Sequence, residues 1–125
     1  MVAAPPPPPS PAAIVRAWSR DLNADRNAAG AKLFAPRAHV IQPGVDVRLT
    51  PKLALAFEES LPCGGRIVDL RRKGNRVTAI FLLTERPKHR CDAPGAKAAA
   101  VFVVRNGRIV LWHQIPVPPD DRPTA

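Results

Sequence analysis

The second half of the chain is patterned almost entirely as β-strand. Four apolar-rich segments follow Gly64-Gly65, at residues 66–73, 76–86, 96–104 and 108–117. The first and last links between them, Gly74-Asn75 and Asn106-Gly107, are dipeptides typical of tight hairpin turns. A longer link of residues 87–95 joins the middle pair. This half therefore predicts a four-stranded antiparallel meander.

The first half has helical spacing instead. Ser10 can cap a helix that carries Pro11 in its first turn and repeats apolar residues at Ile14, Trp18 and Leu22. A second, short helix is expected after Asp25, with Leu33 and Phe34 facing inward, and it should stop before Pro36. A short strand is expected at residues 38–44, broken by Pro-Gly. Thr50-Pro51 then predicts a third helix that carries Leu53, Leu55, Phe57 and Leu61 and stops at Pro62. Helices followed by strands indicate an α+β domain with the helices on one face of a curved sheet.

The length of 125 residues fits one domain. We place it at residues 11–117, between a Pro-rich tail at 1–10 and a C-terminal tail at 118–125, both expected to be disordered. No apolar run is long enough to span a membrane, and no secretory signal is recognisable at the N-terminus. The sequence thus predicts a cytoplasmic protein without a membrane partner.

The formal net charge of +9 raises the possibility of nucleic-acid binding. The basic residues are scattered along the chain, however, and no aromatic residues alternate with them as base-stacking platforms would require. Nucleic acid is therefore not an expected partner, and a solvated basic surface is the preferred interpretation.

The Gly74-Asn75 turn suggests a register for the first hairpin. It places Asp69 opposite Ile80, Arg71 opposite Thr78 and Ile67 opposite Leu82. Both faces of such a hairpin are substantially apolar, so neither is expected to be freely solvated. One face should take the helices, and the other should take a second subunit. The sequence therefore predicts a homodimer through the sheet face.

The two cysteines, Cys63 and Cys91, come close together when this register is extended. A disulfide would close a loop of about 29 residues and stabilise the fold by about 3 kcal/mol if unstrained. A cytoplasmic location favours free thiols instead. Cys63, His89, Cys91 and Asp92 lack the paired spacing of a zinc site, so no metal and no cofactor are expected.

Several strings resemble the nuclear transport factor 2-like superfamily, which includes ketosteroid isomerases, limonene epoxide hydrolases and SnoaL-like cyclases. "LNADRNAAGAKLFAPRAHVIQPG" (22–44) resembles the helix–helix–strand opening of the isomerases, and "LLTER" with "VFVVRNGRIVLWHQ" resembles the late strands of the epoxide hydrolases. The resemblance implies a cone-shaped, cystatin-like roll. In it three N-terminal helices pack on a curved, mainly antiparallel sheet that encloses an apolar cavity, and the opposite sheet face commonly forms dimers.

The catalytic residues of those families are mostly replaced. Where the isomerases have an oxyanion-donor tyrosine, a general-base aspartate and a second oxyanion acid, this chain has Trp18, Gln42 and Lys97. The epoxide hydrolase arginine is present as Arg86. The two aspartates that should accompany it fall on Lys88 and Gln114. Without a carboxylate to move a proton, neither known reaction is expected.

The resemblance nevertheless defines a candidate site. Arg86 and His39 are the candidate catalytic residues, although the face that His39 occupies is left open by a one-residue difference in register. The candidate ligand-binding residues are Trp18, Gln42, Phe57, Lys97, Trp112 and Gln114. Such a cavity suits an apolar, oxygen-bearing small molecule with a carbonyl or acid group.

Each candidate also has a structural explanation. Trp18 and Trp112 can be ordinary core residues, Arg86 can pair with Asp69 across the hairpin, and His39 can lie at the surface. Asp21, Glu58 and Glu59 are expected on solvated helix faces.

Two functions therefore compete at this point. The first is a small-molecule-binding domain, with an isomerase-, cyclase- or hydrolase-type enzyme as its catalytic version. The alternative is a non-catalytic dimeric interaction module, whose Pro-rich tail and basic surface recruit a partner.

Overall fold

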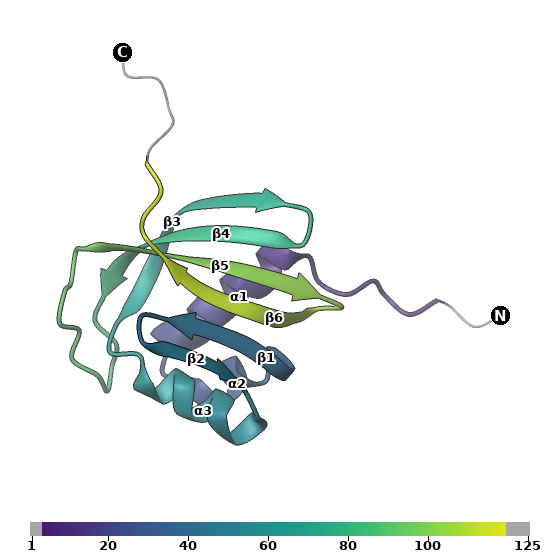
Figure 1. Ribbon diagram of the computed structural model, residues 1–125, viewed down its shortest axis with the longest axis horizontal. Coiled ribbons are helices and arrows are strands. Elements are labelled where there is room, and N and C mark those ends of the chain that lie inside the picture. Colours follow the sequence, from purple (N-terminus) through teal and green to yellow (C-terminus); the bar gives the residue numbers. More distant parts are fainter. Residues whose placement is uncertain (1–3, 120–125) are drawn as a thin grey trace, which may run out of the picture.

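The computed structural model describes residues 4–119 and shows an α+β domain (Figure 1). Its elements in chain order are α1 (Pro11–Asn23), α2 (Asn27–Ala31), β1 (Phe34–Gln42), β2 (Val45–Arg48), α3 (Pro51–Ser60), β3 (Gly64–Lys73), β4 (Arg76–Thr84), β5 (Lys97–Arg105) and β6 (Arg108–Ile115). None of the helices in the described part is long and apolar enough to cross a membrane.

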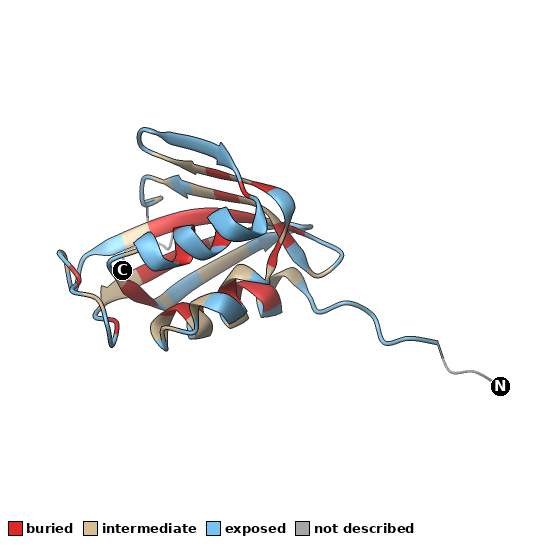
Figure 2. Cartoon of the chain, turned by 90° about the horizontal axis from the view of Figure 1, so that it is seen from below, coloured by how far each residue is buried: buried red, intermediate tan, exposed pale blue. Residues whose placement is uncertain are grey.

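The six strands form one curved sheet in the order β2-β1-β6-β5-β4-β3. The predicted meander of β3 to β6 is confirmed, and all its pairings are antiparallel. β1 adds to the meander in parallel with β6, a pairing between distant segments that local sequence patterns do not reveal. The helices lie across one face of the sheet (Figure 2), which we call the inner face, and the opposite face is the outer face.

Helix α1 forms for the predicted reasons. The Ser10 hydroxyl accepts a hydrogen bond from the backbone N–H of Ala13 over 3.1 Å, and Pro11 occupies the first turn. Ile14, Trp18 and Leu22 are buried against the sheet. Thr50 caps α3 in the same way, accepting from the backbone N–H of Leu53 over 3.2 Å.

The region between α1 and α3 differs from the prediction. α2 ends at Ala31, and Phe34 is the first residue of β1 instead of a helical residue. Arg37 adopts a left-handed conformation (φ 61°) at an irregularity that lets β1 continue past Pro36. The Pro43-Gly44 break is a hairpin turn, because Gly44 supplies the positive φ of 77° that returns the chain as β2. That strand was not predicted.

The β3–β4 register is partly as predicted. Asp69 lies opposite Ile80 and Arg71 opposite Thr78, but Ile67 lies opposite Phe81 and not Leu82. An irregularity between Ile67 and Asp69 inserts one extra residue, as a β-bulge does, and moves Ile67 to the inner face. Val68, the inserted residue, is exposed as a result.

Residues 4–9 are exposed and lie outside the helices and strands. The predicted C-terminal tail of residues 118–125 falls mostly outside the described residues.

Candidate functional site

A cavity of about 270 Å³ opens between α1 and the inner face of the sheet. Its walls combine α1, the α3–β3 link and the inner-facing ends of the strands. The lining residues are Trp18, Leu22, Gln42, Leu61, Pro62, Cys63, Gly64, Gly65, Phe81, Leu83, Asp92, Ala98, Ala99, Ala100, Trp112 and Gln114. The inner-facing Ala98 and Ala100 of β5 leave this space open, since larger side chains at these two positions would fill it.

Four of the six predicted ligand-binding residues line the cavity: Trp18, Gln42, Trp112 and Gln114. The other two do not. Phe57 is buried, with its ring 5.0 Å from that of Trp112, so it supports the cavity wall from behind. Lys97 is exposed at the start of β5. The prediction was wrong for Lys97 because it precedes the inner-facing Ala98 by one residue, and successive strand residues point to opposite faces.

Arg86 does not line the cavity either, although the sequence indicated it as a catalytic residue. Its side chain is 0% exposed, and its guanidinium donates to five acceptors. They are the carbonyl oxygens of Leu22, Glu58 and Leu61, the Asp25 carboxylate and the Asn27 amide oxygen. Arg86 therefore fastens the ends of α1 and α3 to the end of β4, and its proposed pairing with Asp69 is wrong as well. Asp69 lies 3.0 Å from Arg71 instead.

Asp25 is the charged partner of Arg86, with 2.8 Å between Oδ1 and Nε. Its second oxygen accepts from the backbone N–H of Lys88 over 2.6 Å. Burial by itself raises the pKa of Asp25, but the Lys88 hydrogen bond and the Arg86 charge outweigh that effect and hold the pKa below its usual value. Asp25 thus serves as an ionised anchor for Arg86.

His39 faces away from the cavity. It lies opposite Leu111 on the outer face, and its Nε2 is 2.5 Å from the Asp46 carboxylate of β2. The neighbouring strand residues decide the open question of register, because Val40 is fully buried and Gln42 lines the cavity. His39 therefore cannot reach a molecule held in that cavity.

Glu58 is the residue that the sequence analysis missed. Its side chain is fully buried, and Oε1 accepts a hydrogen bond from the Trp18 indole Nε1–H over 2.5 Å. Burial raises the pKa of Glu58 to about 7, against the lowering effects of the Trp18 hydrogen bond and the Arg86 charge. Because the Trp18 N–H is used here, it is not available to a ligand.

The structure makes room for this carboxyl group. A Cβ atom added at Gly30 of α2 would lie 2.8 Å from Glu58 Oε2. The inner face of α3 is formed by Ala54, Phe57 and Glu58, while Leu53 and Leu55 are exposed. The expectation of a solvated face for Glu58 is wrong, because residues 54, 57 and 58 share one buried helical stripe, where a glutamate is uncommon.

Two buried polar atoms in this region have no hydrogen-bond partner among the described residues. They are Glu58 Oε2 and the indole Nε1 of Trp112. The second belongs to Trp112, a residue that lines the cavity, and its N–H is a buried donor without a partner among the described residues.

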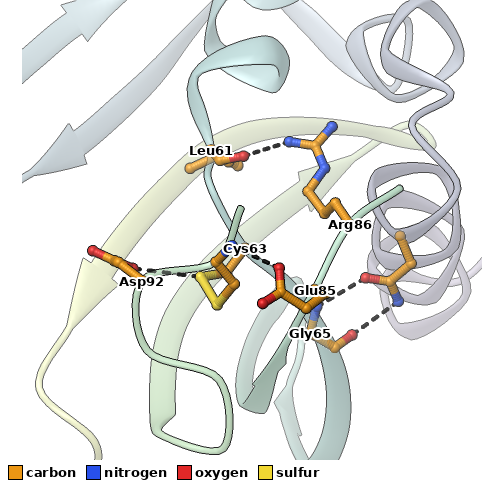
Figure 3. Close-up of a disulfide and its surroundings, with 8 residues drawn as sticks. Leu61, Cys63, Gly65, Glu85, Arg86 and Asp92 are labelled. Atoms are coloured by element: carbon orange, nitrogen blue, oxygen red, sulfur yellow. Dashed lines mark hydrogen bonds between the residues drawn. A yellow bond between two sulfur atoms is a disulfide. The ribbon is translucent and has the colours of Figure 1, made fainter. Parts of the chain in front are cut away.

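A disulfide lies beside the cavity, since Cys63 is one of the lining residues (Figure 3). Cys63 and Cys91 form a disulfide with their Cα atoms 4.5 Å apart, joining the start of β3 to the loop between β4 and β5. Gly64 and Gly65 follow as the first, buried residues of β3. The Asn23 side chain bonds both backbone groups of Gly65, accepting from its N–H over 2.8 Å and donating to its carbonyl over 2.9 Å.

Asp92 provides the only charged side chain among the lining residues of the described part. The comparison of motifs did not find this carboxylate because it lies in the loop, outside the strand positions that carry the family's acids. No lysine, arginine or histidine joins it in the cavity wall, so the wall offers an anion no attraction.

Comparison with solved structures shows the same fold in several proteins. An NTF2-like protein of unknown function from Cytophaga hutchinsonii superposes with a TM-score of 0.71 at 14% identity, covering 85% of this chain and 88% of the other. A proposed polyketide cyclase from Sinorhizobium meliloti gives a TM-score of 0.66 at 16% identity, covering 82% and 94%. A proposed ketosteroid isomerase from Kribbella flavida gives 0.66 at 19% identity, covering 91% and 83%.

The chain therefore has the nuclear transport factor 2-like fold, as the sequence resemblance predicted. No family model and no curated protein matches the sequence. At these identities the likeness establishes the fold and leaves the ligand and any reaction to be argued from the site itself.

Proposed function

We propose that this domain binds an apolar small molecule that carries an uncharged oxygen acceptor, such as a ketone or an ether. The observation that carries the proposal is the Trp112 indole N–H, a buried donor without a partner among the described residues, in a residue that lines an apolar cavity. A ligand oxygen that accepts from this N–H would remove the cost of leaving it unsatisfied.

Size and lining agree with this class of ligand. The cavity of about 270 Å³ lies near the lower end of ligand-site volumes, so a compact molecule is favoured over a steroid. Gln42 and Gln114 add neutral amides, which can donate or accept hydrogen bonds. The acid group that the sequence analysis also allowed is disfavoured, because its expected partner Arg86 is fully occupied elsewhere.

Whether the domain also catalyses a reaction is a separate part of the proposal. The catalytic carboxylates of the superfamily's enzymes are replaced in this chain. A different carboxylate, that of Asp92, lines this cavity. An isomerase- or cyclase-type reaction in this cavity would therefore use Asp92 for proton transfer, with Trp112 as the donor to the developing oxyanion. Exchange of the α-protons of a bound ketone in heavy water, compared between the wild type and Asp92→Asn, tests this version.

Tryptophan fluorescence tests the binding proposal directly, because the two tryptophans of the chain both line the cavity. The probes are menthone, a compact cyclic ketone, and p-menthane, its parent hydrocarbon. We expect menthone to bind more tightly than p-menthane. Trp112→Phe should weaken the affinity for menthone about fivefold to tenfold, because one hydrogen bond is lost, and should leave the affinity for p-menthane unchanged. Lys97→Ala, a change outside the cavity, is the matched control. No saturable response to either probe, or an equal loss for both, would contradict the proposal.

Native mass spectrometry of the purified protein adds an independent test. A bound molecule that disappears on denaturation would supply a mass from which the natural ligand can be identified. The interaction-module alternative assumed a cavity filled by the protein's own side chains, and the open cavity supports binding instead. Deleting residues 1–10 should leave menthone binding intact, whereas a module that works through its proline tail would lose its partner.

We also propose that the outer face of the sheet pairs with a second copy of the chain. Leu82, Val103 and Leu111 lie on this face and are only half-buried in the single chain. A contiguous apolar sheet face of this kind is typical of an interface. Sedimentation should report a dimer for the wild type and a monomer for Leu111→Arg. A monomeric wild type at micromolar concentration would contradict this part of the proposal.

A further inference from the structure

Three metal-ligating side chains converge beside the cavity, and two of them, Cys63 and Asp92, line it. The sulfur atoms of Cys63 and Cys91 and a carboxylate oxygen of Asp92 all lie within 4.8 Å of one another. Asp92 Oδ1 is 3.6 Å from Cys63 Sγ (Figure 3). Cys63 immediately precedes β3, and the other two residues come from the loop between β4 and β5. The sequence argued against a metal site here because the two cysteines lack paired spacing, but the fold brings segments 28 residues apart together.

Both segments are held in place by contacts other than the disulfide. The backbone N–H of Cys91 donates to Glu85 Oε2 over 2.8 Å. On the β3 side, the carbonyl of Leu61 accepts from Arg86, and Gly65 is clamped by Asn23. Reduction of the disulfide would therefore leave two thiols and one carboxylate close together on fixed backbone.

We propose that the reduced protein binds a zinc-class divalent cation through Cys63, Cys91 and Asp92. Two thiolates and a carboxylate suit a borderline-soft ion such as Zn²⁺, and three protein ligands leave one coordination position free. Cys63 and Asp92 both line the cavity, so an ion held between them lies in the cavity wall with its free position accessible to a ligand oxygen. This site goes beyond the proposed binding function and does not depend on it.

The disulfide and the metal site exclude each other. Reduction by a thiol reductant transfers two electrons and two protons to the sulfur pair and converts two reductant thiols into one disulfide. Metal binding then displaces the two thiol protons, because the thiolate is the ligand. Cys63 and Cys91 therefore serve as a bond in the oxidised chain and as a metal site in the reduced chain.

Cobalt is the probe for the experiment, since Co²⁺ occupies zinc sites and reports thiolate ligands by absorption. The full-length protein is reduced with dithiothreitol, desalted under nitrogen and titrated with Co²⁺, and Zn²⁺ is then added as competitor. We expect one Co²⁺ per chain, a thiolate-to-cobalt charge-transfer band with tetrahedral ligand-field bands, and bleaching of these bands by Zn²⁺. The oxidised protein should show none of them.

Variants at two of the three ligands test their contributions. Cys63→Ser should abolish the charge-transfer intensity contributed by one thiolate and weaken binding, and Asp92→Asn should weaken Co²⁺ binding by about tenfold or more. Asp69→Asn, an exposed acidic position on the outer face, should change nothing. Circular dichroism verifies that each reduced protein is folded. A folded, reduced wild type without the charge-transfer band overturns the proposal, as does Co²⁺ binding that Cys63→Ser and Asp92→Asn leave unchanged.

Discussion

Trp18 on α1 and Glu58 on α3 are joined by a hydrogen bond of 2.5 Å from the indole Nε1 to the carboxyl Oε1, and both side chains are buried. The pair sets one wall of the cavity, because the same indole lines it. A protein that needed packing alone would be served at least as well by an apolar side chain at position 58. This pair links a titratable group to the position of a cavity-lining ring, and it leads to the first two predictions.

Glu58→Gln should change how the stability of the fold depends on pH. Burial raises the pKa of Glu58 from 4.5 to about 7 in the folded chain, so the folded state binds the proton more tightly than the unfolded state does. The stabilisation from this proton is complete below pH 4.5 and is lost as the pH rises to about 7, a change of about 3 kcal/mol.

Urea unfolding of the wild type and Glu58→Gln, measured between pH 4.5 and 8, tests this prediction. The wild type should lose stability relative to the variant as the pH rises, because glutamine keeps an oxygen for Trp18 and does not ionise. Glu59→Gln, a change at an exposed neighbour on the same helix, is the control, and its free energy of unfolding should change with pH as that of the wild type does. Parallel curves for all three proteins would show that Glu58 does not titrate in this range.

Gly30→Ala should be destabilising because of Glu58. The new Cβ atom would lie 2.8 Å from Glu58 Oε2, and we expect a cost of about 1–3 kcal/mol. In a Glu58→Ala background the same change should cost little, because the space is free and alanine is the better helix former. A double-mutant cycle by urea denaturation should give a coupling of at least about 1 kcal/mol. Additive effects would mean that the two residues do not constrain each other.

Arg86→Met should unfold the domain rather than inactivate a folded one. The change removes five hydrogen bonds and leaves the buried Asp25 carboxylate without its charge partner. We expect the melting temperature to fall by roughly 10 °C or more. Arg76→Met, at an exposed position, should have little effect. A stable Arg86→Met protein that had lost ligand binding would restore the catalytic interpretation of Arg86.

Gly64→Ala should weaken the attachment of α1 to β3, which the Ser19 hydroxyl also supports by donating to the Gly65 carbonyl. A Cβ atom at this position would lie 2.4 Å from Asn23 Oδ1, so the Asn23 side chain must leave and its two hydrogen bonds with Gly65 are lost. We expect a loss of about 1–3 kcal/mol by chemical denaturation. Asn23→Ala removes the same bonds, so the double variant should be little worse than either single one. A double variant with the full sum of both losses would indicate that the two residues act separately.

The sequence by itself determined the elements that depend on local chemistry. Ser10-Pro11 and Thr50-Pro51 fixed the starts of two helices, and the Gly74-Asn75 and Asn106-Gly107 turns fixed the order of the meander. The alternation of β6 placed Trp112 and Gln114 on one face of the strand, the face that lines the cavity. These features are readable because they depend on residues only a few positions apart, whose spacing dictates which face they share.

Only the tertiary structure decided the chemistry of the site. Whether Arg86 faces a ligand or a ring of acceptors depends on the ends of two helices about 25 and 60 residues away. One extra residue at Val68 moved Ile67 to the other face, and one helical stripe carried Glu58 into the core. Burial, pairing and pKa are set by which distant groups surround a side chain, and no local pattern contains that information.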